Sequence, residues 1–223
     1  MNVAVIQFLG TNCEYDTKWA FELLGAKATV VWHGESKIPA NTDLVVIPGG
    51  FSYGDYLRSG AIARFANVMK SVSDFAANGG KVLGICNGFQ ILLEAGLLPG
   101  AMKRNDTLHF ISKHHNLKVI NNNNTFLKEL NEGDVLNIPV AHHDGNYYID
   151  SEGLAELYAN EQVLLKYCDA QGNVVSMNGA VDQIAGICNK EKNVFGLMPH
   201  PERAMQELLG SSDGVKMIQG FFK

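Results

Sequence analysis

The chain has few cysteines and no long apolar run. Its four cysteines are scattered through 223 residues without a C-x-x-C pair. This spacing argues against a disulfide framework or a zinc knuckle and is typical of a reducing compartment. No stretch approaches the length of a membrane span, and residues 1–7 resemble a first strand more than a signal peptide. We therefore expect a cytoplasmic protein that does not associate with membranes.

Basic clusters and phosphate-binding motifs are also missing. The net charge is −5 and lysines and arginines do not cluster, so neither nucleic acid nor an anionic membrane is an expected partner. No G-x-x-x-x-G-K-[ST] motif occurs, and residues 210–216 have the wrong spacing, so any ATP used in the reaction must bind to another chain. The seven histidines lack a spacing such as H-E-x-x-H, and no metal site is expected.

The first half of the sequence alternates between strand-like and helix-like segments. Strands are expected at 2–8, 28–33, 43–47 and 81–85, and helices at 14–24 and about 60–78. Trp19, Leu23 and Leu24 would lie on one side of the first helix. This alternation predicts an α/β fold with a mostly parallel, doubly wound (flavodoxin-like) sheet and helices on both faces.

The second half changes in character. From about residue 107 to 186, shorter alternating segments separated by turns predict antiparallel strands that extend the sheet. No linker-like composition or internal repeat divides the chain, and hydrophobic residues make up 46% of it. We interpret residues 1–223 as a single domain.

The most informative segment is V-L-G-I-C-N-G-F-Q at residues 82–90. An apolar strand ends at Cys86 and helical apolar spacing follows, which places a thiol at a sharp turn. Gly84 and Gly88 lack the Cβ atoms that would crowd such a turn. A helix beginning at Asn87 would direct N–H groups toward the sulfur and favour a thiolate. Taken alone, the segment fits a buried structural cysteine equally well.

A second segment, H-P-E at residues 200–202, follows an expected strand at 193–198. Pro201 disfavours helical geometry at His200, so we expect an extended segment with His200 and Glu202 on the same side. The imidazole could then accept a thiol proton while the carboxylate orients the ring. Together with Cys86, these residues are predicted to form a Cys-His-Glu catalytic triad.

Two glycines follow the strand at 43–47. Without side chains, Gly49 and Gly50 let backbone N–H groups approach a ligand, and the N–H groups of Gly50 and Asn87 are candidates for an oxyanion hole. An ordinary tight turn would be the simpler interpretation if the triad were not present. Since sites in such sheets form beyond the carboxyl ends of the strands, Gly49, Gly50, Cys86 and His200 could share one cleft.

These residues resemble the class I (triad) glutamine amidotransferases. The strings at 84–90 and 200–202 carry the resemblance to the class. Longer strings at 48–58, 60–64, 96–100 and 196–203, with shorter ones at 10–13 and 141–145, are similar to the glutaminase subunits of phosphoribosylformylglycinamidine synthases. The resemblance runs almost from end to end.

The resemblance implies a reaction and a set of partners. Cys86 would attack the side-chain amide of glutamine to give a thioester and ammonia, while His200 and Glu202 handle the protons. The ammonia would pass to a synthetase subunit, which uses ATP and Mg²⁺ to convert formylglycinamide ribonucleotide in purine synthesis, and a small third subunit would join the complex. This chain would need no cofactor of its own. Four residues are expected to belong to the glutamine pocket: Gly49, Gln90, His142 and Asp144.

Some positions depart from the pattern, and other functions remain open. Ser112-Lys113, Asp144 and Ala180 differ from the residues usual in many relatives, which leaves pocket and subunit contacts undecided. The alternatives are an amidotransferase that serves another acceptor, a cysteine peptidase or stress-type hydrolase, and a catalytically silent regulatory subunit. A free subunit that idles until its synthetase completes the oxyanion hole is a further hypothesis.

Overall fold

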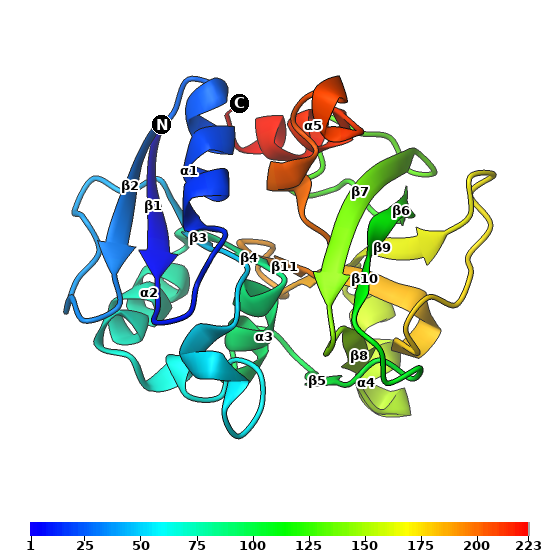
Figure 1. Ribbon diagram of the computed structural model, residues 1–223, viewed down its shortest axis with the longest axis horizontal. Coiled ribbons are helices and arrows are strands. Elements are labelled where there is room, and N and C mark those ends of the chain that lie inside the picture. The colour runs from blue at the N-terminus through cyan, green and yellow to red at the C-terminus, as the bar shows by residue number, and fades with distance from the viewer. Residues whose placement is uncertain (223) are drawn as a thin grey trace.

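A nine-stranded sheet organises the computed structural model, which describes residues 1–222 (Figure 1). The strands lie in the order β2-β1-β3-β4-β11-β10-β9-β6-β7. Five neighbouring strands are parallel: β2 (Lys27–Trp32), β1 (Asn2–Gln7), β3 (Leu44–Ile47), β4 (Lys81–Ile85) and β11 (Val194–Leu197). Four antiparallel strands extend this sheet: β10 (Ile184–Cys188), β9 (Val163–Cys168), β6 (Ile111–Val119) and β7 (Val135–His142). A separate two-stranded sheet pairs β5 (Ala101–Lys103) with β8 (Asn146–Tyr148).

Helices cover both faces of the parallel part. α1 (Glu14–Leu23), α2 (Asn67–Ala77) and α3 (Asn87–Glu94) pack on this part, whereas α5 (Asp213–Gln219) packs against β7, and α4 (Ser151–Ala159) follows β8. The connections β1-α1-β2 and β3-α2-β4 run in opposite directions along the sheet, so right-handed crossovers place α1 and α2 on opposite faces. In β3 and β4 nearly every residue is buried, as expected for strands covered on both sides. The α/β fold with an antiparallel extension is therefore confirmed.

The order of the parallel strands determines where the site forms. In a parallel sheet the carboxyl ends of neighbouring strands meet at one edge. The segments that follow β1, β3, β4 and β11 therefore come together, although they lie near residues 13, 49, 86 and 200 of the sequence.

Three expectations about helices need correction. The helix expected at 60–78 is only Asn67–Ala77, since Gly60 has a positive φ of 82° and Ala66 is extended; Ala63–Phe65 is a short 3₁₀ turn. In α1 the buried side chains are mainly Thr17, Ala20 and Phe21, whereas Trp19 and Leu23 are exposed. The segment 107–186 is not made of strands alone, because it contains α4.

Within residues 1–222, no helix is long and apolar enough to cross a membrane.

Candidate active site

Cys86 stands at a strained turn between β4 and α3. Its φ of 51° and ψ of −107° are unusual for a residue with a side chain, and the first helical residue is Asn87. A Cβ on Gly88 would lie 1.8 Å from the carbonyl oxygen of Ile47, and one on Gly84 would lie 2.7 Å from the backbone of Gly88. The turn therefore requires both glycines, as the sequence predicted. The Cys86 thiol points toward the carbonyl oxygen of Ala141, at 3.6 Å.

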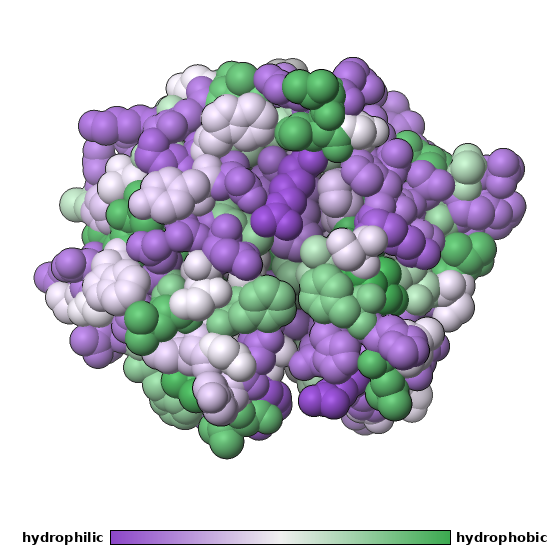
Figure 2. Space-filling model, viewed as in Figure 1, coloured by the Kyte–Doolittle hydropathy of each residue, from purple (hydrophilic) through white to green (hydrophobic). Residues whose placement is uncertain are grey.

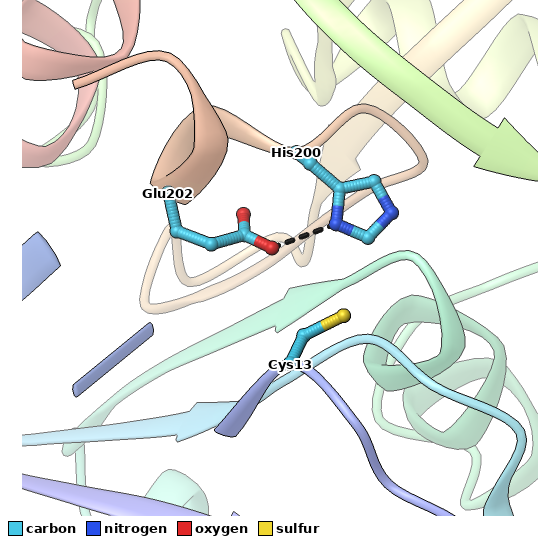
Figure 3. Close-up of side chains that lie close together, drawn as sticks. All are labelled: Cys13, His200 and Glu202. Carbon is cyan, nitrogen blue, oxygen red and sulfur yellow. Dashed lines mark hydrogen bonds and ion pairs between the residues drawn. The ribbon is translucent and has the colours of Figure 1, made fainter. Parts of the chain in front are cut away.

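His200 and Glu202 form a buried hydrogen-bonded pair. His200 Nδ1 and Glu202 Oε1 are 2.7 Å apart, and both side chains are almost fully enclosed (Figure 3). The expected extended conformation is wrong, because Pro201–Arg203 is a 3₁₀ turn. The fixed φ of proline suits the first position of a helical turn as well as an extended segment, and here the turn brings the two side chains together.

The charges around His200 favour its protonated form. Burial alone would lower the pKa of His200, but the negative charges of Glu202 and Cys86 outweigh it and hold this pKa well above the ordinary value. The effect of Cys86 on this pKa places its sulfur near the imidazole. Since Nδ1 faces Glu202, Nε2 is left for the thiol. This arrangement is compatible with the predicted Cys-His-Glu triad.

Gly49 lies in the middle of this group. A Cβ at this position would lie 2.6 Å from His200 Cε1, 3.1 Å from Cys13 Sγ and 3.4 Å from Cys86 Cβ. Gly50 has a φ of 149°, and a Cβ there would meet the backbone of Thr11 and Asn12 at 2.7 and 2.8 Å. Gly49 is thus required for the close approach of the β3 loop to His200 and Cys86, and Gly50 for its close approach to the segment after β1.

Two residues of the predicted pocket, Gln90 and Asp144, belong to one chain of hydrogen bonds. The N–H of Ser52 donates to Asn87 Oδ1 (3.0 Å), and Asn87 Nδ2 donates to Gln90 Oε1 (2.8 Å). Gln90 Nε2 in turn donates to the backbone oxygen of Asp144 (2.6 Å), whose side chain accepts a bond from Ser59 (2.8 Å). This chain fixes the loop after β7 over the start of α3, so Gln90 and Asp144 lie at the site.

His142 and the neighbouring Gly145 are held by two buried asparagines that the sequence did not single out, of which Asn105 contacts His142 itself. Asn105 Oδ1 lies 3.1 Å from His142 Nδ1 and also accepts from the N–H of Gly145, while Asn178 Nδ2 donates to the oxygen of Gly145. Burial, with a smaller effect of the positive His200, lowers the pKa of His142 from 6.5 to about 4. His142 is therefore a neutral support for the loop at neutral pH.

This shift predicts an acid sensitivity. Between pH 6.5 and about 4 the unfolded chain takes up a proton on His142 that the folded chain does not, so folding stability falls as the pH is lowered. The effect is about 3 kcal/mol, from about 1.4 kcal/mol per pH unit. In His142→Gln the stability loss between pH 7.5 and 4.5, measured by urea denaturation, should be smaller by about 2–3 kcal/mol. The exposed His109→Gln is the control, and an unchanged pH dependence in His142→Gln would contradict this account.

Two residues near the triad were missed by sequence reasoning. Asp55 faces Asn87 and Asp144, and burial together with the charge of Asp144 raises the pKa of Asp55 to about 6. Cys13 follows β1 and lies against the His200–Glu202 pair (Figure 3). The G-T-N-C string containing Cys13 gave a signal only through resemblance, because its contact with His200 joins opposite ends of the chain.

Comparison with known proteins shows the family of the chain. The model of the CobB/CobQ-like glutamine amidotransferase domain matches residues 1–216. The phosphoribosylformylglycinamidine synthase subunit PurQ of Sulfurimonas denitrificans is 67% identical over 100% of both chains. The protein of the same name from Wolinella succinogenes is 61% identical over 99% of both chains.

Solved structures of similar proteins support the same family. A chain in the structure of PurLQS from Thermotoga maritima has a TM-score of 0.89 at 39% identity, covering 99% of this chain and 97% of that one. A glutamine amidotransferase from Thermotoga maritima, at 16% identity and a TM-score of 0.58, shares the fold over 92% of this chain and 77% of that one. The chain belongs to the CobB/CobQ-like glutamine amidotransferase family and, within it, to the PurQ subunits of phosphoribosylformylglycinamidine synthase.

Proposed function

We propose that Cys86, His200 and Glu202 carry out the glutaminase half-reaction of this family. The Cys86 thiolate attacks the side-chain carbonyl carbon of glutamine, and the protonated His200 gives its proton to the leaving nitrogen, which departs as ammonia. A glutamyl thioester remains on the sulfur. His200 then takes a proton from water, which attacks the thioester and releases glutamate and the free thiol. Glu202 stays ionised and orients the ring throughout.

The N–H groups of Gly50 and Asn87 are proposed to stabilise the tetrahedral intermediates. They flank Cys86 from the β3 loop and from the first turn of α3, where the helix dipole adds to the stabilisation of a negative oxygen. Gly49, Gln90, His142 and Asp144 are proposed to line or support the glutamine pocket. No cofactor is proposed in this chain.

One observation supports this proposal more strongly than any other. A thiol on a strained turn lies at the same sheet edge as a buried imidazole whose other nitrogen is held by a carboxylate at 2.7 Å. A structural cysteine would need neither the strain nor the charged pair. A regulatory subunit without activity would have no use for either feature.

The ammonia is proposed to serve a synthetase subunit, with a small third subunit in the same complex. This rests on the names of the relatives and on the PurLQS structure, to which this chain is similar. The synthetase would bind ATP and Mg²⁺ and convert formylglycinamide ribonucleotide to formylglycinamidine ribonucleotide in purine biosynthesis. Four unpaired cysteines are compatible with the cytoplasmic location that we propose.

Reconstitution tests the proposal. The purified chain is mixed with its synthetase and third subunit, formylglycinamide ribonucleotide, ATP, Mg²⁺ and glutamine, and product is measured by chromatography. We expect product with glutamine only when this chain is present, whereas ammonium salts should support synthesis without it. If glutamine supports no synthesis in the full mixture, the proposed function is wrong.

The free chain is expected to hydrolyse glutamine slowly. Cys86 is only 5% exposed, and the loop at Asp144 is tied to Ser59 and Gln90 across the pocket. Docking of the synthetase should favour an open arrangement and raise glutamine turnover by about 5- to 150-fold, the usual range of coupling between sites. The measurement is glutamate release with and without the synthetase, and equal rates would contradict the expectation.

A further inference from the structure

A second thiol lies beside the triad and has no part in the mechanism above. Cys13 is 2% exposed, and its N–H donates to the oxygen of Gly49 at 3.2 Å, which fixes it beneath the site. Figure 3 shows its sulfur directed toward the His200–Glu202 pair. The His200–Glu202 pair therefore has two thiols near it. One belongs to Cys86, and the other belongs to Cys13 in the segment after β1.

These three side chains form a set of metal donors. Cys13 Sγ, an imidazole nitrogen of His200 and a carboxylate oxygen of Glu202 all lie within 4.8 Å of one another, and all three residues are buried. Sulfur, imidazole and carboxylate are the donors that zinc uses, at about 2.0–2.3 Å. In a tetrahedral site with such bonds the donors lie roughly 3.3–3.8 Å apart. Only small movements would bring this set to that spacing.

The carboxylate offers an independent sign of a missing partner. Glu202 Oε2 is buried and has no hydrogen-bond partner among the described residues, while Oε1 bonds to His200. An unpaired oxygen on a buried carboxylate is costly, and native structures usually satisfy it. A cation between Cys13 and Glu202 would supply the missing interaction.

A cavity beside α1 borders one member of this set, Glu202. This cavity, of about 500 Å³, is lined by Asp16 and Trp19 of α1, by Pro139, and by Glu202 and Arg203. It lies between α1 and β7, and Figure 2 shows hydrophilic and apolar side chains side by side over this part of the molecule.

Arg203 lines this cavity and contacts the sulfur of Cys13. Its Nη2 lies 3.2 Å from Cys13 Sγ and 3.0 Å from Asp16 Oδ2. The Asp16–Arg203 pair is partly exposed, so parting it costs little. Displacement of the guanidinium would open the sulfur to a cation.

We propose that Cys13, His200 and Glu202 form an inhibitory binding site for a thiophilic divalent cation, zinc above all. The cation displaces the thiol proton of Cys13 and the Nδ1 proton of His200 to solvent, and takes the place of the His200–Glu202 hydrogen bond. The neutral ring then keeps its single proton on Nε2 and cannot accept one from Cys86. A water molecule completes the coordination. Inhibition rests on the proposed function, whereas binding of the cation does not.

Cobalt(II) spectroscopy on the full chain tests the site. Co²⁺ replaces zinc and gives a thiolate-to-cobalt absorption band in the near ultraviolet. We expect Cys86→Ser to keep this band and Cys13→Ser to lose it, while Glu202→Gln weakens cobalt binding by about 10- to 100-fold. Cys13→Ala is measured in parallel, and thermal unfolding checks that each variant is folded.

The other outcomes would overturn the proposal. A band that persists in Cys13→Ser and Cys13→Ala but vanishes in Cys86→Ser would place the cation on the candidate nucleophile. A band present in all these variants would assign it to the remaining cysteines, and no band in the unsubstituted chain would exclude the site.

Measurements of glutamine hydrolysis distinguish a failure of the cation site from a failure of the proposed function. Zinc should inhibit glutamine hydrolysis by the unsubstituted complex, and Cys13→Ser should need at least about tenfold more zinc for the same inhibition. Equal inhibition of both proteins would overturn the inhibitory role. If the cobalt band behaves as expected but no glutamine is hydrolysed, the cation site stands and the proposed function fails.

Discussion

Cys86→Ser is expected to lower glutamine hydrolysis by about 10⁴-fold or more, the scale seen when the nucleophile of a catalytic triad is removed. Serine has nearly the shape of cysteine and fits the strained turn, but its hydroxyl is a far weaker acid and is not activated by the charged His200. Glutamate release and glutamine-dependent synthesis, both measured in the reconstituted complex, should fall together.

Ammonium salts provide the internal control. With ammonia supplied directly, the complex containing Cys86→Ser should synthesise product at the rate of the unsubstituted complex, because the docking surfaces are unchanged. Cys13→Ser is the matched control for thiol loss and should retain glutamine hydrolysis in the absence of zinc. If Cys86→Ser still hydrolyses glutamine, Cys86 is not the nucleophile.

Gly49→Ala is expected to reduce turnover by about 100-fold without unfolding the protein. The added Cβ would lie 2.6 Å from His200 Cε1, whereas ordinary contacts begin near 3.4 Å, so the ring must shift by close to an ångström. A displacement of about 1 Å in a catalytic group costs roughly 10²-fold. The φ of Gly49 lies outside the left-handed region, so alanine adds no backbone strain. Steady-state turnover and thermal unfolding of the variant are the measurements.

Gly34→Ala controls for the loss of a glycine. A Cβ there would lie 3.1 Å from the indole of Trp32, which is partly exposed and can move aside. This variant should keep both stability and turnover. Normal turnover in Gly49→Ala would show that His200 does not need its observed position.

The parts of the fold that the sequence predicted are those with strong local signals. The strands β1, β3 and β4 are short apolar runs bounded by turn residues, and the turn at Cys86 is bracketed by glycines that the backbone requires. The topology then determines the position of the site, because parallel strands bring their carboxyl ends to one edge of the sheet. This is why Cys86 and His200 could be associated although more than half of the chain separates them.

The errors came where tertiary contacts override the local pattern. Phe65 continues the helical spacing of α2 but is 73% exposed, because Gly60 packs closely on α3 and Ala66 turns the chain before the helix begins. The helix α4 was not predicted, because Leu157 is its only buried residue and the helix therefore lacks a clear apolar face. Its N-cap residue Asp150 could have indicated where it begins. Asn105, Asp55 and Cys13 act through contacts with distant segments, which no local spacing encodes.

Labelling with an electrophilic glutamine analogue tests the central claim most directly. The purified chain, free and in complex with its synthetase, is treated with the analogue with and without excess glutamine, and the adduct is located by peptide mass spectrometry. We predict a single adduct on Cys86 that glutamine prevents and that Cys86→Ser abolishes. An adduct on Cys13, or none on Cys86 even in the complex, would contradict the assignment of Cys86 as the glutamine-specific nucleophile.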